Sequence, residues 1–144
     1  MRNILLIIDV QDTFLKQSTV HIPEEIRRFY RRNRFDQVIQ TRKANKFARM
    51  KADNFLLSDI PSITTTRSTY SALTDELRAL LKKDDIIYIV GLETDACVLG
   101  TCFALFDAGY TFRVVREAVA TNHIGVERAV FELMVSNFGE DALL

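Results

Sequence analysis

The first apolar segment of the chain is a short, unbroken run that ends at an acidic residue. Residues Ile4 to Ile8 are all aliphatic, and Asp9 follows them directly. An apolar run without polar alternation is typical of a strand that is covered on both faces, as in a parallel sheet. The pattern therefore predicts a buried strand over residues 3–10, with Asp9 at its carboxyl end.

Strand and helix patterns alternate along the rest of the chain. Pro23, followed by Glu24 and Glu25, is typical of a first helical turn, and Gly109 is typical of a helix end. Residues 41–61 show no clear period and are predicted to form a connection with one short helix. The predicted strands are 3–10, 35–40, 62–66, 85–92 and 112–115, and the predicted helices are 23–34, 74–83, 95–108 and 126–137. This alternation predicts an α/β fold, a three-layer α/β/α sandwich with a mostly parallel, doubly wound central sheet of five to six strands.

Length and charge narrow the class of protein. The 144 residues, 48% hydrophobic and 26% charged, fit one globular domain that spans 1–144. The 19 basic and 19 acidic side chains cancel, so no overall field favours nucleic acid or a membrane. The apolar start is too short for a signal peptide or a membrane span. Cys97 and Cys102 are not placed to pair, and a cytoplasmic location is therefore expected.

A basic run with interleaved aromatic residues could in principle contact nucleic acid. Its side chains lie in the helix predicted over 23–34, where Glu24 and Glu25 are within reach of Arg27 and Arg28. A solvated helix face with local ion pairs is the favoured interpretation, because the chain as a whole is neutral. The run consists of Arg27, Arg28, Phe29, Tyr30, Arg31, Arg32 and Arg34.

Three chemically active side chains follow predicted strands. Asp9 ends the first, Arg67 follows the third, and Cys97 lies in the first turn of the helix after the fourth. Ligands gather at the carboxyl ends of strands in an open parallel sheet, and a helix N-terminus stabilises a thiolate. A nucleophile, a carboxylate and a cation would then share one site.

Simpler interpretations remain open for these positions. A cysteine in an apolar helix is usually a small core residue, and Arg67 alone would be a surface or ion-pairing arginine. Cys102 is predicted to be a core residue, and His21 and His123 to be ordinary loop residues.

Two motifs carry a resemblance to a known family. Asp9-Val10-Gln11-Asp12-Thr13-Phe14 matches the pattern Asp-x-Gln-x-x-Phe after an apolar strand. The segment from Gly91 to Val98 matches Gly-x-x-Thr-x-x-Cys-Val before a helix of small residues. With these motifs the chain resembles the isochorismatase-like cysteine hydrolases, the family that includes nicotinamidases and carbamoyl-hydrolysing enzymes. The similarity covers the chain in order.

The resemblance implies a covalent mechanism. Cys97 would attack a carbonyl carbon, Asp9 would accept the thiol proton, and the acyl-enzyme would be hydrolysed by water. It also implies a cis peptide between Leu92 and Glu93, with the backbone N–H groups of Glu93 and Cys97 directed at the oxyanion. A homo-oligomer, dimer or tetramer, is expected as well. The residues expected at the substrate pocket are Gln11, Phe14, Tyr70 and Thr94.

The sequence departs from the family pattern in two places. The family's catalytic lysine corresponds to Arg67, which keeps the positive charge but does not readily transfer a proton. The metal-binding pattern Thr-Arg-Asp-x-His corresponds to residues 41–45, where Lys43 and Asn45 replace the two ligands. Since a protonated lysine does not bind a cation, neither a metal nor another cofactor is expected, and nicotinamidase activity is disfavoured.

Two functions follow from these expectations. The first is hydrolysis of a small amide, carbamoyl or ester substrate through Cys97. The alternative is a catalytically impaired member of the family that acts as a binding or scaffold subunit, because Arg67 replaces the lysine. In the oligomer, Phe103, Leu105 and Phe106 would form a contact face or belong to the core.

Overall fold

The computed structural model describes residues 1–44 and 56–144. Most of the connection predicted over 41–61, with its short helix, and Asn45 lie outside the described residues. None of the described helices is both long and apolar enough to cross a membrane. The strands are β1 (Asn3–Ile8), β2 (Gln37–Lys43), β3 (Ile63–Arg67), β4 (Ile86–Leu92) and β5 (Thr111–Ala120). The helices are α1 (Ile22–Arg32), α2 (Asp75–Leu80), α3 (Leu99–Asp107) and α4 (Glu127–Phe138), with short turns η1 (Asp12–Phe14), η2 (Thr94–Val98) and η3 (Glu140–Ala142).

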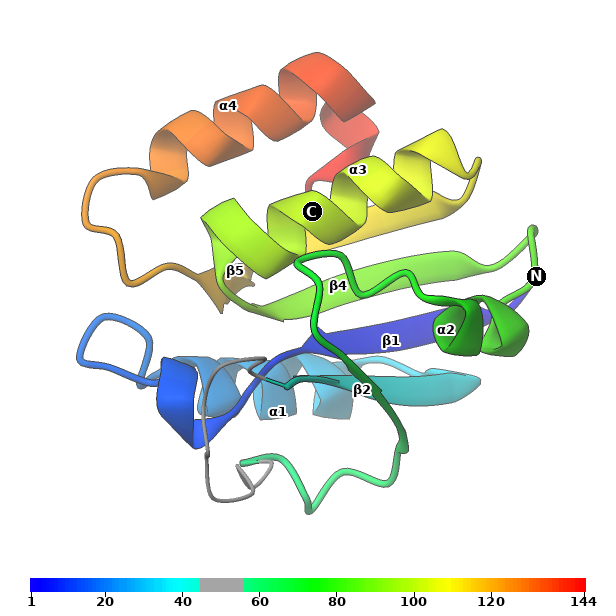
Figure 1. Ribbon diagram of the computed structural model, residues 1–144, viewed down its shortest axis with the longest axis horizontal. Helices are drawn as coiled ribbons and strands as arrows, with labels where there is room; N and C mark the ends of the chain where they lie inside the picture. Colours follow the sequence, from blue (N-terminus) through cyan, green and yellow to red (C-terminus); the bar gives the residue numbers. More distant parts are fainter. Residues whose placement is uncertain (45–55) are drawn as a thin grey trace.

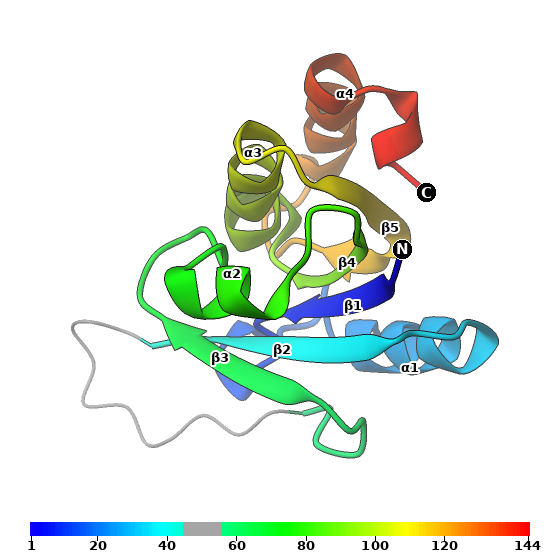
Figure 2. The same ribbon diagram turned by 90° about the vertical axis from the view of Figure 1, so that its right-hand side faces the viewer.

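The five strands form one parallel sheet in the order β3-β2-β1-β4-β5. Helix α1 covers one face, and α2, α3 and α4 lie on the other (Figures 1 and 2). The predicted three-layer, doubly wound fold is confirmed, with five strands. The strand order reverses between β1 and β4, so their carboxyl ends flank the crevice where such folds place a ligand.

Strand β1 forms the centre of both hydrophobic cores. Ile4, Leu6 and Ile8 pack against the face that carries α2, α3 and α4, whereas Leu5 and Ile7 pack toward α1. All five are fully buried. Because each buried aliphatic side chain contributes about 1.5–3 kcal/mol, this strand is held firmly, and with it the position of Asp9 at its end.

The last strand is longer than the apolar pattern predicted. β5 extends from Thr111 to Ala120, whereas residues 112–115 were predicted. Exposed Arg116 and Glu117 interrupt the apolar run, but β5 is an edge strand, where charged side chains are tolerated. Its pairing with β4 shifts register between Ile89 and Gly91.

Arg27, Arg28 and Arg31 of α1 form ion pairs at the surface. Arg27 pairs with Glu24 and Asp59, and Arg28 pairs with Glu25 at 2.7 Å. This agrees with the interpretation of the basic run as a solvated helix face. Exposed pairs of this kind add little to stability.

Gly91 allows β4 to approach β1 beside the end of the crevice. It has a φ of +120°, and a Cβ at this position would lie 2.1 Å from the carbonyl oxygen of Ile8. Gly91 also pairs in register with Ile8, the residue before Asp9. A side chain here would therefore push apart the two strands that support the site.

We expect Gly91→Ala to lower the free energy of unfolding by about 3 kcal/mol or more, since backbone strain and a steric clash combine. Urea denaturation measures this. Gly109→Ala is the matched control, because Gly109 also has a positive φ of +78° but open space around it. The control should lose only about 1 kcal/mol. Equal losses in the two variants would contradict the close approach at Gly91.

Candidate functional site

A cavity of about 260 Å³ opens at the carboxyl ends of β1, β2 and β4. This is the crevice that the strand order predicts. Apolar and charged side chains both line it, and six of the sequence-predicted site residues meet there: Asp9, Phe14, Tyr70, Leu92, Glu93 and Cys97. The described lining residues are Asp9, Phe14, Lys43, Tyr70, Leu92, Glu93, Ala96, Cys97 and His123.

A buried ion pair joins Asp9 to Arg67. Arg67 Nη2 donates to Asp9 Oδ2 at 2.9 Å, and Nη1 donates to Oδ1. The Thr41 hydroxyl donates to the same Oδ1 at 3.0 Å. The two side chains are only 1% and 3% exposed, so the pair is bidentate and almost dry. Asp9 has a φ of +52°, a conformation that aspartate tolerates better than most residues.

The remaining donors of Arg67 are held by the loop that follows β3. Nη2 also donates to the carbonyl oxygen of Tyr70 at 3.2 Å, and Nε donates to that of Ser71 at 3.4 Å. The next residue in this loop, Ala72, donates its N–H to the Thr101 hydroxyl, which in turn donates to the Cys97 carbonyl oxygen at 2.6 Å. The ends of β1 and β3 are thereby fixed relative to the start of α3.

Cys97 lies in the wall of the cavity, in the π-helical turn η2 that leads into α3. Burial, together with the charge of Asp9 and a hydrogen bond to it, raises the pKa of the thiol to about 12, while Arg67 and Lys43 act in the opposite direction. Burial and the neighbouring carboxylate both favour the thiol over the thiolate. At neutral pH the free protein holds a thiol.

The structure contains the expected cis peptide, and two of the four expected pocket residues line the cavity. The peptide between Leu92 and Glu93 is cis, as the resemblance implied. Phe14 and Tyr70 line the cavity. Gln11 and Thr94 are buried and are not among the described lining residues.

Gln11 and Thr94 instead form hydrogen bonds with segments that surround the cavity. The Thr94 hydroxyl donates to Glu127 Oε1 at 2.7 Å, which connects η2 to the start of α4. Gln11 binds the backbone of Lys43: its Oε1 accepts from the Lys43 N–H at 2.9 Å, and its Nε2 donates to the Lys43 carbonyl oxygen at 3.3 Å. The resemblance predicts Thr94 in the pocket and predicts that Gln11 lines the pocket or orients Asp9. Neither side chain is among the described lining residues, because a motif indicates proximity to a site and not side-chain direction.

Lys43, at the end of β2, was not identified as a site residue from the sequence. It pairs in register with Arg67, and its ammonium lies 3.9 Å from the centroid of the Tyr70 ring. The available signal was its position at a strand end, the rule that identified Asp9 and Arg67. In the resemblance noted from the sequence, Lys43 corresponds to the aspartate of the metal-binding pattern. A protonated amine is no ligand, so the donor set does not fit the metal.

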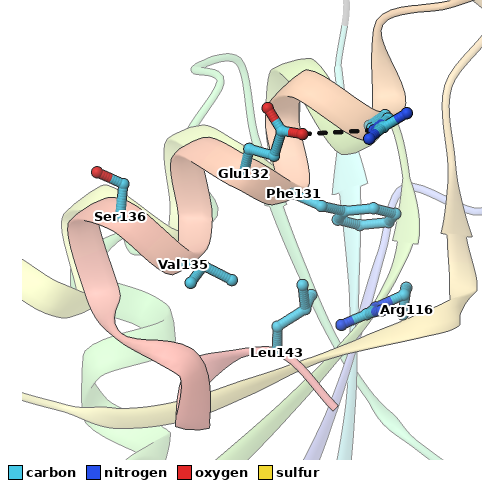
Figure 3. A pocket seen from close by; sticks show the side chains of 7 residues that line it. Arg116, Phe131, Glu132, Val135, Ser136 and Leu143 are labelled. Carbon is cyan, nitrogen blue, oxygen red and sulfur yellow. Dashed lines mark ion pairs between the residues drawn. The ribbon is translucent and has the colours of Figure 1, made fainter.

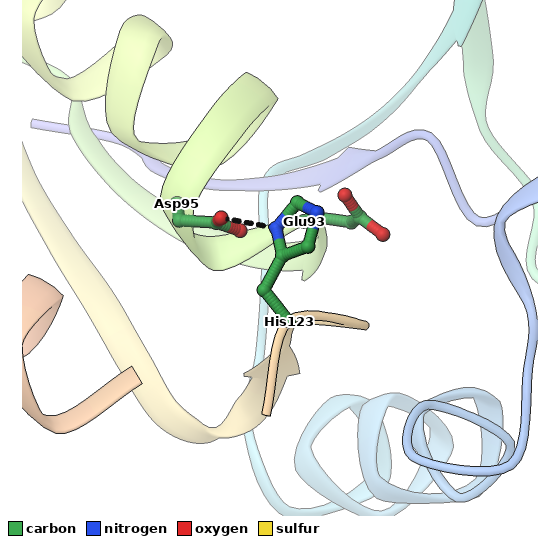
Figure 4. A group of neighbouring side chains, drawn as sticks. All are labelled: Glu93, Asp95 and His123. Atoms are coloured by element: carbon green, nitrogen blue, oxygen red, sulfur yellow. Dashed lines mark hydrogen bonds and ion pairs between the residues drawn. The ribbon is translucent and has the colours of Figure 1, made fainter. Parts of the chain in front are cut away.

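His123 lies in a loop, as expected, but it also lines the mouth of the cavity. Its Nδ1 is 2.6 Å from Asp95 Oδ2, and this contact raises the pKa of His123 (Figure 4). Burial tends to raise the pKa of Asp95, but hydrogen bonds with Thr121 and His123 hold it below the usual value. With Glu93 these side chains bring three ligand-type atoms within 4.8 Å of one another. Hydrogen bonds already engage each of them, Glu93 through Asn122.

A larger groove of about 600 Å³ lies elsewhere, between α4 and the chain end beyond β5 (Figure 3). Arg116 lies over the Phe131 ring there, and Arg128 pairs with Glu132 at 3.4 Å. Among the described residues that line this groove, no thiol or histidine is present. The smaller cavity with Cys97 is therefore the candidate reaction site.

Comparisons with known proteins identify the family and the fold of the chain. The family model described as the isochorismatase domain matches residues 3–141. No curated protein matches the sequence significantly. The fold of a cysteine hydrolase from Pseudomonas syringae pv. phaseolicola 1448A is similar, with a TM-score of 0.82 at 19% identity, over 96% of this chain and 87% of that one.

Two further solved structures share the fold. The MAR1 ribonuclease from Caenorhabditis elegans has a TM-score of 0.82 at 22% identity, over 99% of this chain and 76% of that one. The nicotinamidase PncA from Bacillus subtilis has a TM-score of 0.75 at 15% identity, over 99% of each chain. Similarity at these identities shows the fold and leaves the substrate open.

We expect Arg67→Met to lower the free energy of unfolding by about 3–5 kcal/mol, because it leaves the Asp9 carboxylate buried without its partner. The double variant Asp9→Asn/Arg67→Met should recover much of that loss, since it buries no unpaired charge. Urea denaturation of both single variants, the double variant and the parent gives the coupling between the two residues. Effects that add within about 0.5 kcal/mol would contradict the ion pair.

The contact between Asp95 and His123 should be visible in an NMR titration of the histidine ring protons. The midpoint of His123 should lie above that of the same residue in Asp95→Asn, where the carboxylate is lost. Because the folded-state pKa of His123 is raised, the stabilisation is fully present below about pH 6.5 and is lost as pH rises through the raised value. An unchanged midpoint in the variant would contradict the contact.

Proposed function

Because the chain belongs to the isochorismatase family, whose structural neighbours include a cysteine hydrolase and nicotinamidases, we propose that it hydrolyses a small amide, carbamoyl or ester substrate through Cys97. One observation carries the proposal. The Cys97 thiol and the Asp9 carboxylate line the same cavity, and the carboxylate is close enough to act on the pKa of the thiol. A nucleophile with an adjacent base is what acyl transfer requires.

Acylation begins with the thiol and not with a preformed thiolate. The raised pKa of Cys97 means that its proton must leave as the sulfur attacks, and the Asp9 carboxylate in the same cavity is the candidate acceptor. The Sγ–C bond forms, and the proton moves to Asp9. The tetrahedral intermediate then expels the amine or alcohol, which takes the proton from Asp9. A thioester on Cys97 and an ionised Asp9 remain.

Deacylation returns the site to its starting state. Water attacks the thioester carbonyl carbon and transfers a proton to Asp9. The C–Sγ bond then breaks, and the sulfur recovers the proton as the carboxylic or carbamic acid leaves. Arg67 stays charged throughout and holds the Asp9 carboxylate in place, which is the part of a lysine's role that a guanidinium retains.

The cavity favours a small acyl group. About 260 Å³ is below the range of about 300–1,000 Å³ that is typical of drug-sized ligand sites. Phe14, Tyr70, Leu92 and Ala96 provide apolar walls on which a flat amide or ester can pack. The Glu93 and Cys97 backbone N–H groups are our candidates for binding the oxyanion.

An activated ester tests the nucleophile without knowledge of the natural substrate. With p-nitrophenyl acetate we expect a burst of about one nitrophenolate per chain, together with an acetyl group on Cys97 found by mass spectrometry after acid quenching. Cys97→Ser should abolish both signals.

The second cysteine provides the matched control. Cys102 is fully buried, and burial raises its pKa. Cys102→Ala should therefore keep the burst and the acetylated peptide. A burst that persists in Cys97→Ser, or that disappears only in Cys102→Ala, would overturn the proposed function.

A further inference from the structure

The site contains two cations, and one of them is already neutralised. The guanidinium of Arg67 donates twice to Asp9 and twice to backbone carbonyl oxygens of the following loop. Its side chain is only 3% exposed. Arg67 and Asp9 together therefore present almost no net charge to a sulfur atom that becomes negative during attack.

The ammonium of Lys43 is differently placed. Lys43 lines the same cavity as Cys97, and Nζ lies over the Tyr70 ring. Within residues 1–44 and 56–144 it has no carboxylate partner. Its positive charge is thus uncompensated by that part of the chain, and it faces the space where a substrate would bind.

The backbone of Lys43 is held at the point from which its side chain enters the cavity. The amide of Gln11 binds both the N–H and the carbonyl oxygen of Lys43. Ala44, the next residue, donates its N–H to the Arg67 carbonyl oxygen at 2.7 Å. The ends of β1, β2 and β3 therefore fix the half-buried Lys43 together with the Asp9–Arg67 pair.

We propose that Lys43, from the end of β2, supplies the catalytic positive charge that stabilises the developing Cys97 thiolate, in place of the lysine that Arg67 has replaced at the end of β3. This rests on the proposed function of Cys97. The catalytic cation would then come from β2, the strand next to β3 in the sheet. The charges of Arg67 and Lys43 both lower the pKa of Cys97, against the larger effects of burial and of Asp9, the partner of Arg67.

The charges that face Cys97 come from several elements. Asp9 follows β1, Lys43 and Arg67 end β2 and β3, and Glu93 and His123 lie at the cavity mouth. Only Lys43 among them is a cation without a carboxylate partner in the described chain. Substitution of Lys43 leaves the other four groups in place. A difference in the reactivity of Cys97 between the variant and the parent is therefore due to Lys43.

The rate at which Cys97 is alkylated reports on the thiolate directly. The parent for this experiment carries Cys102→Ala, so that Cys97 is the only thiol. Rates with neutral iodoacetamide and with anionic iodoacetate are measured from pH 7 to 10 for the parent, Lys43→Met, Lys43→Arg and Arg42→Gln. Arg42 is the matched control, because it is adjacent on β2 but points to the other face of the strand.

We expect Lys43→Met to lower the rate of Cys97 alkylation by iodoacetamide about threefold to tenfold and to shift its pH profile to higher pH. The rate with iodoacetate should fall more strongly. Lys43→Arg should restore most of both rates, and Arg42→Gln should match the parent. Unfolding midpoints confirm that the variants remain folded.

Other outcomes separate the two proposals. If Cys97 reacts in the parent, and Lys43→Met has the same profile or Arg42→Gln is slowed equally, the role of Lys43 is wrong while Cys97 remains the nucleophile. If Cys97 is not alkylated in the parent across the pH range, the proposed function fails, and the role of Lys43 fails with it.

Discussion

The buried ion pair between Asp9 and Arg67 is the interaction on which the arrangement of the site depends. Removing two charges from water costs several kcal/mol per ion, and only good geometry with additional hydrogen bonds offsets that cost. Here Thr41 and two loop carbonyl groups provide the additional bonds. The ends of β1 and β3 and the following loop are therefore fixed relative to one another, and the loop is fixed to Cys97 through Thr101.

The parallel sheet is what makes this pair possible. Asp9 and Arg67 are 58 residues apart in the chain, yet strand order β3-β2-β1 places their carboxyl ends at one edge. Gly91 permits β4 to approach β1, so that Leu92, Glu93 and the turn with Cys97 enter the same crevice. The hydrophobic cores on both faces hold the strands, and the strand ends hold the polar groups.

The sequence predicted much of this and failed for identifiable reasons. Apolar runs in β1 and β4 predicted buried strands because both faces of these strands are covered. Charged residues concealed the length of β5, since an edge strand need not be apolar throughout. Site residues that follow strands were found by position. The direction of Thr94, the bond between Gln11 and Lys43, and the contact of Asp95 with His123 depend on segments far apart in sequence, which no local pattern reveals.

The choice of an arginine at position 67 has two separable consequences. A guanidinium is well suited to a bidentate, dehydrated contact with one carboxylate, and it gives a firmer ion pair than an ammonium would. The same geometry uses its donors and its charge, so that little remains for the sulfur atom. In a site where burial already opposes ionisation of Cys97, the proposed role of Lys43 is to supply a second positive charge from the same sheet edge. Lys43, held beside Arg67 by the amide of Gln11, is in the position to provide it.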